Sequence, residues 1–170
     1  IGTILFQSRN PHEGARLPLT VRVSPSLMRL LGYIVSEGTI GDRFIIITNF
    51  DTETIADIRQ CLEELNVTYF NRKDGSFVVS SRTHVTFMKG LGVTGKSHEK
   101  RVPSFVFTAS NAHSAEFLKG YFEGDGGVER HSVTACTKSK GLASDLAYLL
   151  LRFGIVARLS ARKKRATNSG

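Results

Sequence analysis

The sequence predicts an α+β fold made of two similar halves that are related by a pseudo-twofold axis. The first observation is a nine-residue pattern that occurs twice, at 30–38 (LLGYIVSEG) and at 118–126 (LKGYFEGDG), 88 residues apart. The second is that residues 45–67 and 133–155 continue the match at the same offset, with apolar positions falling on apolar positions. A repeat of this length indicates a duplicated half-domain, because a solenoid has a shorter period.

A helix and a strand open the first half. Ser24 followed by Pro25 is a typical N-cap with a proline in the first helical turn, so a helix is expected from here to Gly38. Beyond a tight turn at Gly41, the apolar residues 44–48 predict a strand.

A second helix and two further strands follow in the first half. Asp51 or Thr52 is expected to cap this helix, because apolar residues recur at helical spacing from Ile55 to Leu65. The remaining expected elements are strands near 67–71 and 77–80 and a helix over 81–89.

The second half repeats this order but is expected to be truncated. Its first helix begins near Ser110 or Asn111 and ends at Gly126, and a strand and a helix follow. At a period of 88 residues a full second copy would end near residue 205, so a counterpart of the strand and helix at 77–89 is not expected within the chain. The expected organisation is an N-terminal arm or linker (1–23), a first half (24–109) and an incomplete second half (110–170).

The charge of the chain points to a class of partner. There are 23 Lys and Arg against 15 Asp and Glu, which gives a net charge of +8. A small basic protein usually binds a polyanion, first of all nucleic acid, although a basic surface can also serve solubility. The excess is uneven, since residues 140–170 hold seven Lys or Arg and one acid. No apolar run is long enough for a membrane span. Two separated cysteines favour a reducing intracellular setting without a structural metal.

The repeated pattern places small residues four positions apart on one face of each helix. These are Gly32 and Ser36 in the first copy and Gly120 and Gly124 in the second. A glycine inside a helix costs about 0.8–1 kcal/mol relative to alanine, so close contact between the two helix backbones must return at least as much. The two helices are therefore expected to pack against each other along these faces.

This packing would bring Glu37 and Asp125 together at one end of the helix pair. Each acid lies at the C-terminal end of its helix, where the negative pole of the helix dipole disfavours a carboxylate. Two carboxylates roughly 4 Å apart repel each other by about 4 kcal/mol at an effective dielectric constant of about 20. A divalent cation between them would turn this repulsion into a binding site. The alternative is that each acid points into solvent.

The two nine-residue segments resemble the paired motifs of the LAGLIDADG homing endonucleases, in particular the single-chain two-motif enzymes and those of archaeal inteins. The resemblance extends from about Arg16 to the end of the chain. It implies an αββαββα fold for each half, with the motif helices at the interface and the sheets forming a saddle on duplex DNA. It also implies site-specific hydrolysis of both DNA strands with Mg²⁺ (or Mn²⁺) by a monomer on a long asymmetric target, in the setting of an intein or an intron.

The resemblance assigns roles to individual residues by their motif positions. Glu37 and Asp125 take the place of the metal-binding acids of the family. The main-chain carbonyl groups of the preceding residues, Ser36 and Gly124, would help to hold the metal or its water.

A further catalytic group is expected at the end of the strand before each second helix, where family members carry polar or basic residues. The first half has Asn49 there, and the second has Thr137 and Lys138. Lys138 could neutralise developing charge or orient water, whereas Phe50 at its repeat position cannot, so the two half-sites are expected to be unequal. An exposed lysine at a helix start is also common, which is the alternative.

Strands and hairpin turns are expected to supply the contacts to DNA. The basic run at 162–165 would bind phosphates, and strand residues would reach base edges, with Arg158 and Ser160 alternating along a strand. The full expected set is Arg43, Arg72, Lys73, Arg82, Arg130, Ser132, Thr134, Arg158, Ser160, Arg162, Lys163, Lys164 and Arg165.

The sequence has two alternative interpretations. Residues 90–97 (GLGVTGKS) match the pattern of a phosphate-binding loop, but a proline at 103 follows closely and no apolar strand ending in Asp comes after it, so nucleotide binding is not expected. The alternative to DNA cleavage is a nucleic-acid-binding module that has lost catalysis, such as an RNA-splicing maturase or a regulator.

Overall fold

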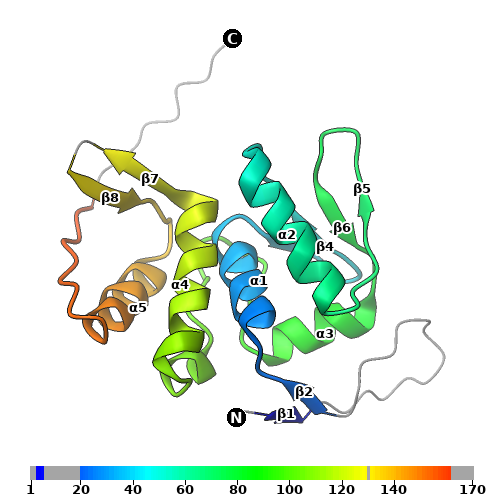
Figure 1. Ribbon diagram of the computed structural model, residues 1–170, viewed down its shortest axis with the longest axis horizontal. Coiled ribbons are helices and arrows are strands. Elements are labelled where there is room, and N and C mark those ends of the chain that lie inside the picture. The colour runs from blue at the N-terminus through cyan, green and yellow to red at the C-terminus, as the bar shows by residue number, and fades with distance from the viewer. Residues whose placement is uncertain (1–2, 6–19, 130, 162–170) are drawn as a thin grey trace.

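The computed structural model describes residues 3–5, 20–129 and 131–161 of the chain. A short antiparallel ribbon comes first, formed by β1 (Thr3–Leu5) and β2 (Thr20–Arg22). It lies at the start of the first long helix (Figure 1).

The first half has the αββαββα order that the resemblance implies. Its four strands form one antiparallel sheet in the order β3-β4-β6-β5. The expected helices and strands are confirmed, and β3 is the strand that the resemblance implies but the residue pattern does not locate. The elements are α1 (Pro25–Ser36), β3 (Thr39–Ile40), β4 (Ile45–Ile47), α2 (Thr52–Glu64), β5 (Phe70–Asn71), β6 (Phe77–Val79) and α3 (Arg82–Gly90).

The second half has the order αββα within the described residues. The hairpin registers match across the repeat: Ile40 lies opposite Ile45 in β3–β4, and Val128 lies opposite Val133 in β7–β8. The same pairing at an offset of 88 residues confirms the internal repeat. The elements are a 3-10 helix η1 (Ser104–Phe107), α4 (Asn111–Asp125), β7 (Gly126–Glu129), β8 (Ser132–Ala135) and α5 (Lys140–Leu151).

The segment after α5 differs from the prediction. Strand-like alternation was expected at Arg158 and Ser160, and this expectation is wrong, because residues 155–161 form no strand. A strand needs a neighbour to pair its backbone N–H and C=O groups. In the described part of the chain, β8 pairs only with β7.

Each α-helix begins at a side chain that accepts a hydrogen bond from a backbone N–H of the first turn, which would otherwise lack a partner. Asp51 caps α2 and Ser139 caps α5, at equivalent positions of the repeat. The other capping residues are Ser24, Ser81 and Ser110.

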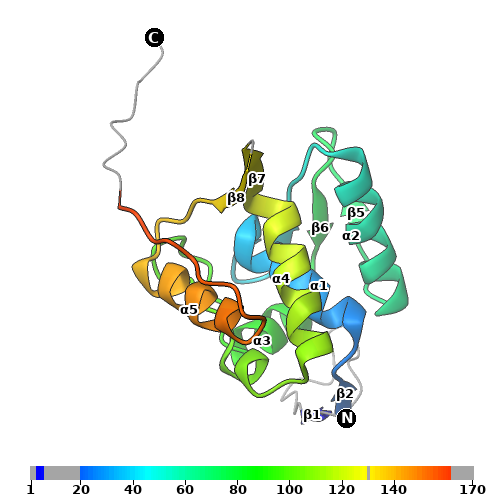
Figure 2. The same cartoon turned by 60° about the vertical axis from the view of Figure 1, so that its left-hand side comes forward.

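The hydrophobic core surrounds α1, whose residues from Leu30 to Val35 are all buried. This helix contacts α2 and β4 of its own half and packs along α4 of the other half. Figure 2 shows α1 and α4 side by side, with α2 and the sheet on one side of the pair and α5 on the other. Among the described residues, no helix is long and apolar enough to cross a membrane.

Candidate active site

Glycine-lined faces bring α1 and α4 into direct backbone contact. A Cβ atom added to Gly32 would lie 2.6 Å from a backbone nitrogen of α4. On α4, a Cβ at Gly120 would collide with the carbonyl oxygen of Arg29, and one at Gly124 would collide with the Oγ of Ser36. The four small residues of the repeat therefore lie at the α1–α4 contact.

Glu37 and Asp125 lie at the paired C-terminal ends of these two helices. Glu37 is the C-cap residue of α1, and Asp125 is the last residue of α4. The Glu37 side chain passes beside Gly124, where an added Cβ would be 3.5 Å from the Cγ of Glu37. The structure thus brings the two acids of the repeat to one end of the helix pair.

The two carboxyl groups carry charge that is poorly compensated. Burial, followed by the negative charge of Asp125, raises the pKa of Glu37, whereas Lys100 lowers it. Burial also raises the pKa of Asp125, again opposed by Lys100. Within the described residues, neither carboxylate accepts a hydrogen bond or forms an ion pair.

Lys100 is a site residue that the sequence analysis missed. Its side chain is buried, with the residue only 7% exposed. The Nζ donates to three main-chain oxygens at the end of α1, those of Ile34 (3.4 Å), Ser36 (3.0 Å) and Gly38 (2.9 Å). The ammonium thus uses its three donors on the negative pole of α1. Burial lowers the pKa of Lys100, and the two nearby acids raise it.

The segment that carries Lys100 is fixed to α5. The Oγ of Ser139 donates to the carbonyl oxygen of Lys100 at 2.7 Å. Asp145 accepts from Arg101 through Nε (2.6 Å) and the second guanidinium nitrogen (2.8 Å), and from the backbone N–H of Val102 (3.1 Å). The helix α5 of the second half therefore positions Lys100, which binds the C-terminal end of α1 in the first half.

The donor set at this helix end fits a hard divalent cation. Two carboxylates without hydrogen-bond partners offer the oxygen ligands that Mg²⁺ prefers, and Mg²⁺ is usually bound by one or two carboxylates together with waters and substrate phosphates. No three His, Cys, Asp or Glu side chains group together in the described part of the chain. The carbonyl oxygen of Ser36 already accepts from Lys100, which leaves it one lone pair for a cation or its water.

Asn49 and Lys138 lie at the expected strand ends, beside helix caps. Asn49 is buried, and its Oδ1 accepts from the backbone N–H of Asp51 at 2.9 Å. Thr137, its repeat counterpart, accepts in the same way from the backbone of Ser139 at 3.1 Å. Lys138 is exposed. Among the described residues, no hydrogen bond or ion pair joins Asn49 or Lys138 to either of the two acids. Their catalytic roles therefore stay predictions.

The residues expected to contact DNA lie mostly on exposed turns and strand ends. Figure 1 shows the β5–β6 and β7–β8 hairpins extending toward the end of the molecule at which α1 and α4 finish. Exposed positions of the first half are Arg43, Arg72, Lys73 and Arg82. In the second half, Ser132, Arg158 and Ser160 are exposed and Thr134 is half-buried. Outside the described residues lie Arg130, Arg162, Lys163, Lys164 and Arg165.

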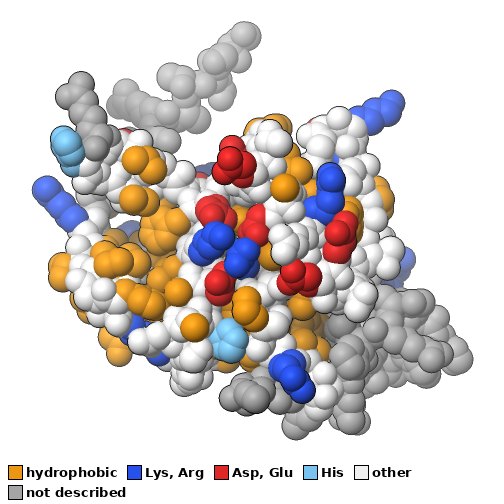
Figure 3. All heavy atoms as spheres, viewed as in Figure 1, with side chains coloured by type: hydrophobic (Ala, Val, Ile, Leu, Met, Phe, Trp, Pro, Cys, Tyr) orange, Lys and Arg blue, Asp and Glu red, His pale blue; other side chains and the backbone are white. Residues whose placement is uncertain are grey.

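A polar network that the sequence analysis also missed joins α1, α2 and α4. Arg29 donates to Glu116 through Nε at 2.7 Å and to Asp57 through a terminal nitrogen at 2.5 Å. The hydroxyl of Tyr33 lies within hydrogen-bonding distance of Asp57 (2.7 Å) and Glu123 (2.5 Å). Figure 3 shows acidic and basic side chains gathered near the middle of the face in view. Glu123 therefore takes part in the contact between the halves.

The segment that matches a phosphate-binding loop has a different structure. After Gly90 ends α3, the chain passes through turns and reaches the 3-10 helix η1 at Ser104. A phosphate-binding loop needs an α-helix N-terminus directly after it, and residues 97–103 do not form one.

Known proteins share this fold. Residues 112–170 match the family model described as LAGLIDADG-like domain. The homing endonuclease I-DmoI in complex with DNA and Mn superposes with a TM-score of 0.57 at 18% identity, over 79% of this chain and 81% of that chain. The complex of I-DmoI with DNA and Ca gives the same TM-score over 80% and 75% of the two chains, at 18% identity.

Sequence relatives occur inside much longer proteins. A replication factor C small subunit of Methanocaldococcus jannaschii is 34% identical over 84% of this chain, and a DNA polymerase II large subunit of Thermococcus kodakarensis is 34% identical over 84% of it. The chain spans only 8% of the length of each of these relatives. From the repeat, the glycine-packed helices and these matches, the chain is identified as a LAGLIDADG-type protein with the fold of a LAGLIDADG homing endonuclease.

Proposed function

We propose that the chain is a site-specific endonuclease that hydrolyses both strands of duplex DNA, with Glu37 and Asp125 as the metal-binding acids. The observation that supports this most strongly is the juxtaposition of these two acids. Each stands at the negative end of its helix, both have raised pKa values, and neither has a hydrogen-bond partner in the described part of the chain. Fold stability alone gives no reason for such an arrangement, and a cation-dependent reaction does.

The residues around the acids suit phosphodiester hydrolysis. Bound Mg²⁺ or Mn²⁺ would supply an activated water and stabilise the leaving oxygen. Glu37 and Asp125 would hold it from opposite halves, with the main-chain oxygens of Ser36 and Gly124 beside them. Lys100 limits the repulsion between the two acids, because its positive charge acts on both of them. Asn49 and Lys138 are proposed as unequal auxiliary groups of the two half-sites.

The distribution of basic residues supports duplex DNA as the substrate. Arg72 and Lys73 form the turn of one hairpin, and that hairpin extends to the same end of the molecule as the two acids (Figure 1). Phosphate contacts from such turns supply affinity and position, and strand residues such as Ser132 and Thr134 can read base edges. The pseudo-twofold relation of the halves matches the two strands of an asymmetric target, and a monomer would suffice.

The sequence relatives suggest that the chain is a segment inserted into longer host proteins. The matching segment occurs in proteins named as replication factor C, DNA polymerase, an RNA polymerase subunit and an aminotransferase. These names share no activity, and the segment occupies at most 18% of each. A segment common to such different proteins serves its own function, which is the behaviour of a mobile, intein-borne nuclease.

Cleavage of a duplex library tests this proposal. The chain is incubated with DNA carrying randomised cores and with Mg²⁺, and new ends are sequenced. The expected result is paired cuts at a common sequence, lost in Glu37→Gln and in Asp125→Asn and in EDTA. Glu129→Gln, an exposed acid of β7, is the matched control and should cut normally.

Two outcomes would contradict the proposal. Cuts that persist in both acid variants would show that these residues are not the reacting centre. Sequence-selective binding of the library without any cut, in Mg²⁺ and in Mn²⁺, would favour the second candidate, a binding module of the maturase or regulator type.

A further inference from the structure

The first-half sheet carries a row of apolar side chains on the side away from the helices. Ile46 lies opposite Val78, and Val78 lies opposite Phe70, so the three side chains project from neighbouring strands on the same face. Phe70 is 54% exposed, Ile46 is half-buried and Val78 is buried. We call these three residues the apolar row.

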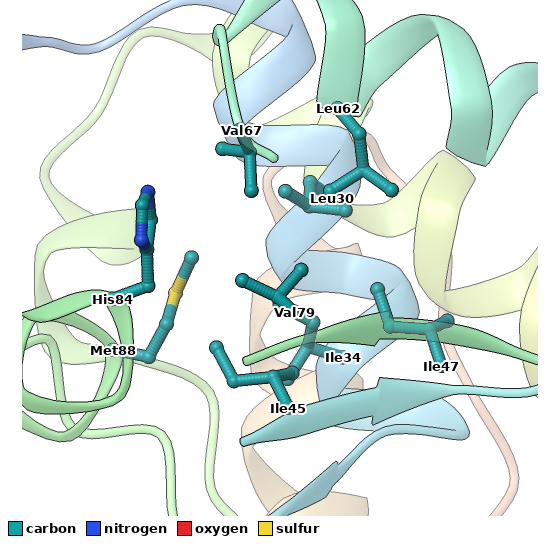
Figure 4. A pocket seen from close by; sticks show the side chains of 9 residues that line it. All are labelled: Leu30, Ile34, Ile45, Ile47, Leu62, Val67, Val79, His84 and Met88. Atoms are coloured by element: carbon teal, nitrogen blue, oxygen red, sulfur yellow. The ribbon is translucent and has the colours of Figure 1, made fainter. Parts of the chain in front are cut away.

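The helices lie on the other face of this sheet. Ile45, Ile47 and Val79 are strand neighbours of the apolar row and point to the opposite face, because successive side chains of a strand alternate. They line one cavity together with Leu30 of α1 and Leu62 of α2 (Figure 4). The apolar row does not belong to the hydrophobic core that these residues form. Its side chains are therefore placed for contact with something other than the helices.

The second half carries polar residues at the equivalent positions. Thr134 stands 88 positions after Ile46. Ser132 stands 88 positions after Phe44, which is 39% exposed. The two hairpins have equivalent registers, so these positions lie on equivalent faces. A duplex that crosses both halves would thus meet apolar side chains on the first and hydroxyl groups on the second.

Basic side chains and the candidate metal site border the apolar row. Arg72 comes two residues after Phe70, Arg43 lies in the turn before β4, and both are exposed. At the other end, β3 begins two residues after Glu37 and pairs with the strand that bears Ile46. Cations at the border of such a surface bind phosphates and fix the position of the duplex, which leaves the base edges to the side chains between them.

We propose that the apolar row reads the C5-methyl groups of thymines, in the major groove of the half-site that the first half binds. The major groove admits a β-ribbon, and thymine is the base that presents a methyl group there. Apolar side chains gain free energy when they bury this methyl group, whereas they leave the amino group of a cytosine without a partner. Uracil lacks the methyl group, so the same row favours DNA over RNA. The inference rests on the proposed function, in that it takes duplex DNA as the ligand.

Deoxyuridine tests the proposal, because it differs from thymidine only by the lost methyl group. Duplexes that bind the chain in Ca²⁺ are selected from the randomised library, and the thymines of each half-site are then replaced by deoxyuridine in turn. Each methyl group that the row buries is expected to tighten binding about fourfold. Replacement in one half-site should therefore raise the dissociation constant, and the double variant Ile46→Thr/Phe70→Thr should bind the thymine and deoxyuridine duplexes equally.

Three further variants separate recognition from folding. Phe70→Leu keeps an apolar side chain and should keep the preference for thymine. Phe70→Thr changes only the exposed member of the row and should lose part of the preference, even if the double variant melts early. Val128→Thr is the matched control, since Val128 is an exposed apolar strand residue on the opposite face of its hairpin. It should bind both duplexes as the parent chain does.

The outcomes distinguish this proposal from the proposed cleavage. Equal binding of the thymine and deoxyuridine duplexes by the parent chain, or a thymine preference that survives in a folded double variant, would overturn the reading of methyl groups and leave cleavage intact. A thymine preference that the double variant loses, in a chain that binds but does not cut in Mg²⁺, would support the reading of methyl groups and contradict cleavage. A chain that binds no duplex would overturn both.

Discussion

Lys100 donates from its Nζ to the main-chain oxygen of Ser36 at 3.0 Å, one residue before the acid Glu37. The buried ammonium group thus binds the main-chain oxygens at the C-terminal end of α1, next to the contact with the second half. Since 64 residues separate the two, this contact fixes the candidate site and the association of the halves together.

Lys100→Met is expected to damage both stability and activity. The methionine keeps the length of the stem but removes three hydrogen bonds, so the free energy of unfolding should fall by about 3 kcal/mol. Cleavage should fall by about 100-fold, because the acids lose their positive neighbour. Lys96→Met is the control, since the Lys96 side chain is 71% exposed and, within the described part of the chain, makes only a 3.5 Å contact with Glu99. Equal effects of the two substitutions on melting and cleavage would contradict this role of Lys100.

Glu37→Gln is expected to stabilise the metal-free protein at neutral pH. Because burial and Asp125 raise the pKa of Glu37, the folded state binds more protons than the unfolded state between the ordinary and the raised pKa. Stability therefore falls as pH rises through that window and stays lower above it. Glutamine removes this loss, so its advantage in melting temperature should be small at pH 4 and larger at pH 7.5. A variant that is less stable than the parent at pH 7.5 in EDTA would contradict the argument.

Addition of Mn²⁺ should reverse this order. A cation that binds the folded state raises its stability by mass action, so the melting temperature of the parent chain should rise with Mn²⁺ concentration. Glu37→Gln lacks one of the two carboxylates and should respond much less. Calorimetric titration with Mn²⁺ alone checks the same point at constant temperature. An equal rise for parent and variant would place the binding site elsewhere.

The sequence predicted those parts of the molecule that depend on local patterns. Ser24 and Asp51 cap the expected helices, and the glycine-lined faces meet as expected. These features recur at fixed spacings along the chain, so they can be recognised in the amino-acid sequence alone. The residue pattern did not locate the short strand β3, which only the αββαββα order of the resemblance implies, because two residues, Thr39 and Ile40, carry no periodic signal.

Long-range polar contacts could not be predicted in the same way. Lys100 reaches the end of α1 across 64 residues, and Arg29 reaches Glu116 across 87. Neither residue differs in the sequence from an ordinary surface charge. The expected strand at Arg158 and Ser160 failed for another reason: alternation predicts a strand only where a neighbour is present to pair with it.

Gly32→Ala is expected to destabilise the protein, although alanine favours helix formation. The added Cβ would collide with the carbonyl oxygen of Phe117 and lie 2.6 Å from the backbone nitrogen of Tyr121, forcing the helices apart at a cost of about 2 kcal/mol that exceeds the helical gain. Gly90→Ala is the matched control, since Gly90 ends α3 and an added Cβ there would meet no atom of the described residues within 4 Å. It should be neutral or stabilising in chemical denaturation. Stabilisation by Gly32→Ala would mean that α1 and α4 do not make this close contact.

Two tyrosines at equivalent positions of the repeat should respond oppositely to loss of their hydroxyl groups. The Tyr33 hydroxyl lies against Asp57 and Glu123, and the Tyr121 hydroxyl is buried without a partner among the residues that the structure describes. Tyr33→Phe removes a hydrogen bond to a charged group and should lower the free energy of unfolding by about 2 kcal/mol. Tyr121→Phe removes an unsatisfied polar atom and should leave stability unchanged or raise it. Urea denaturation of both variants checks this, and a Tyr121→Phe loss as large as that of Tyr33→Phe would contradict the assigned contacts.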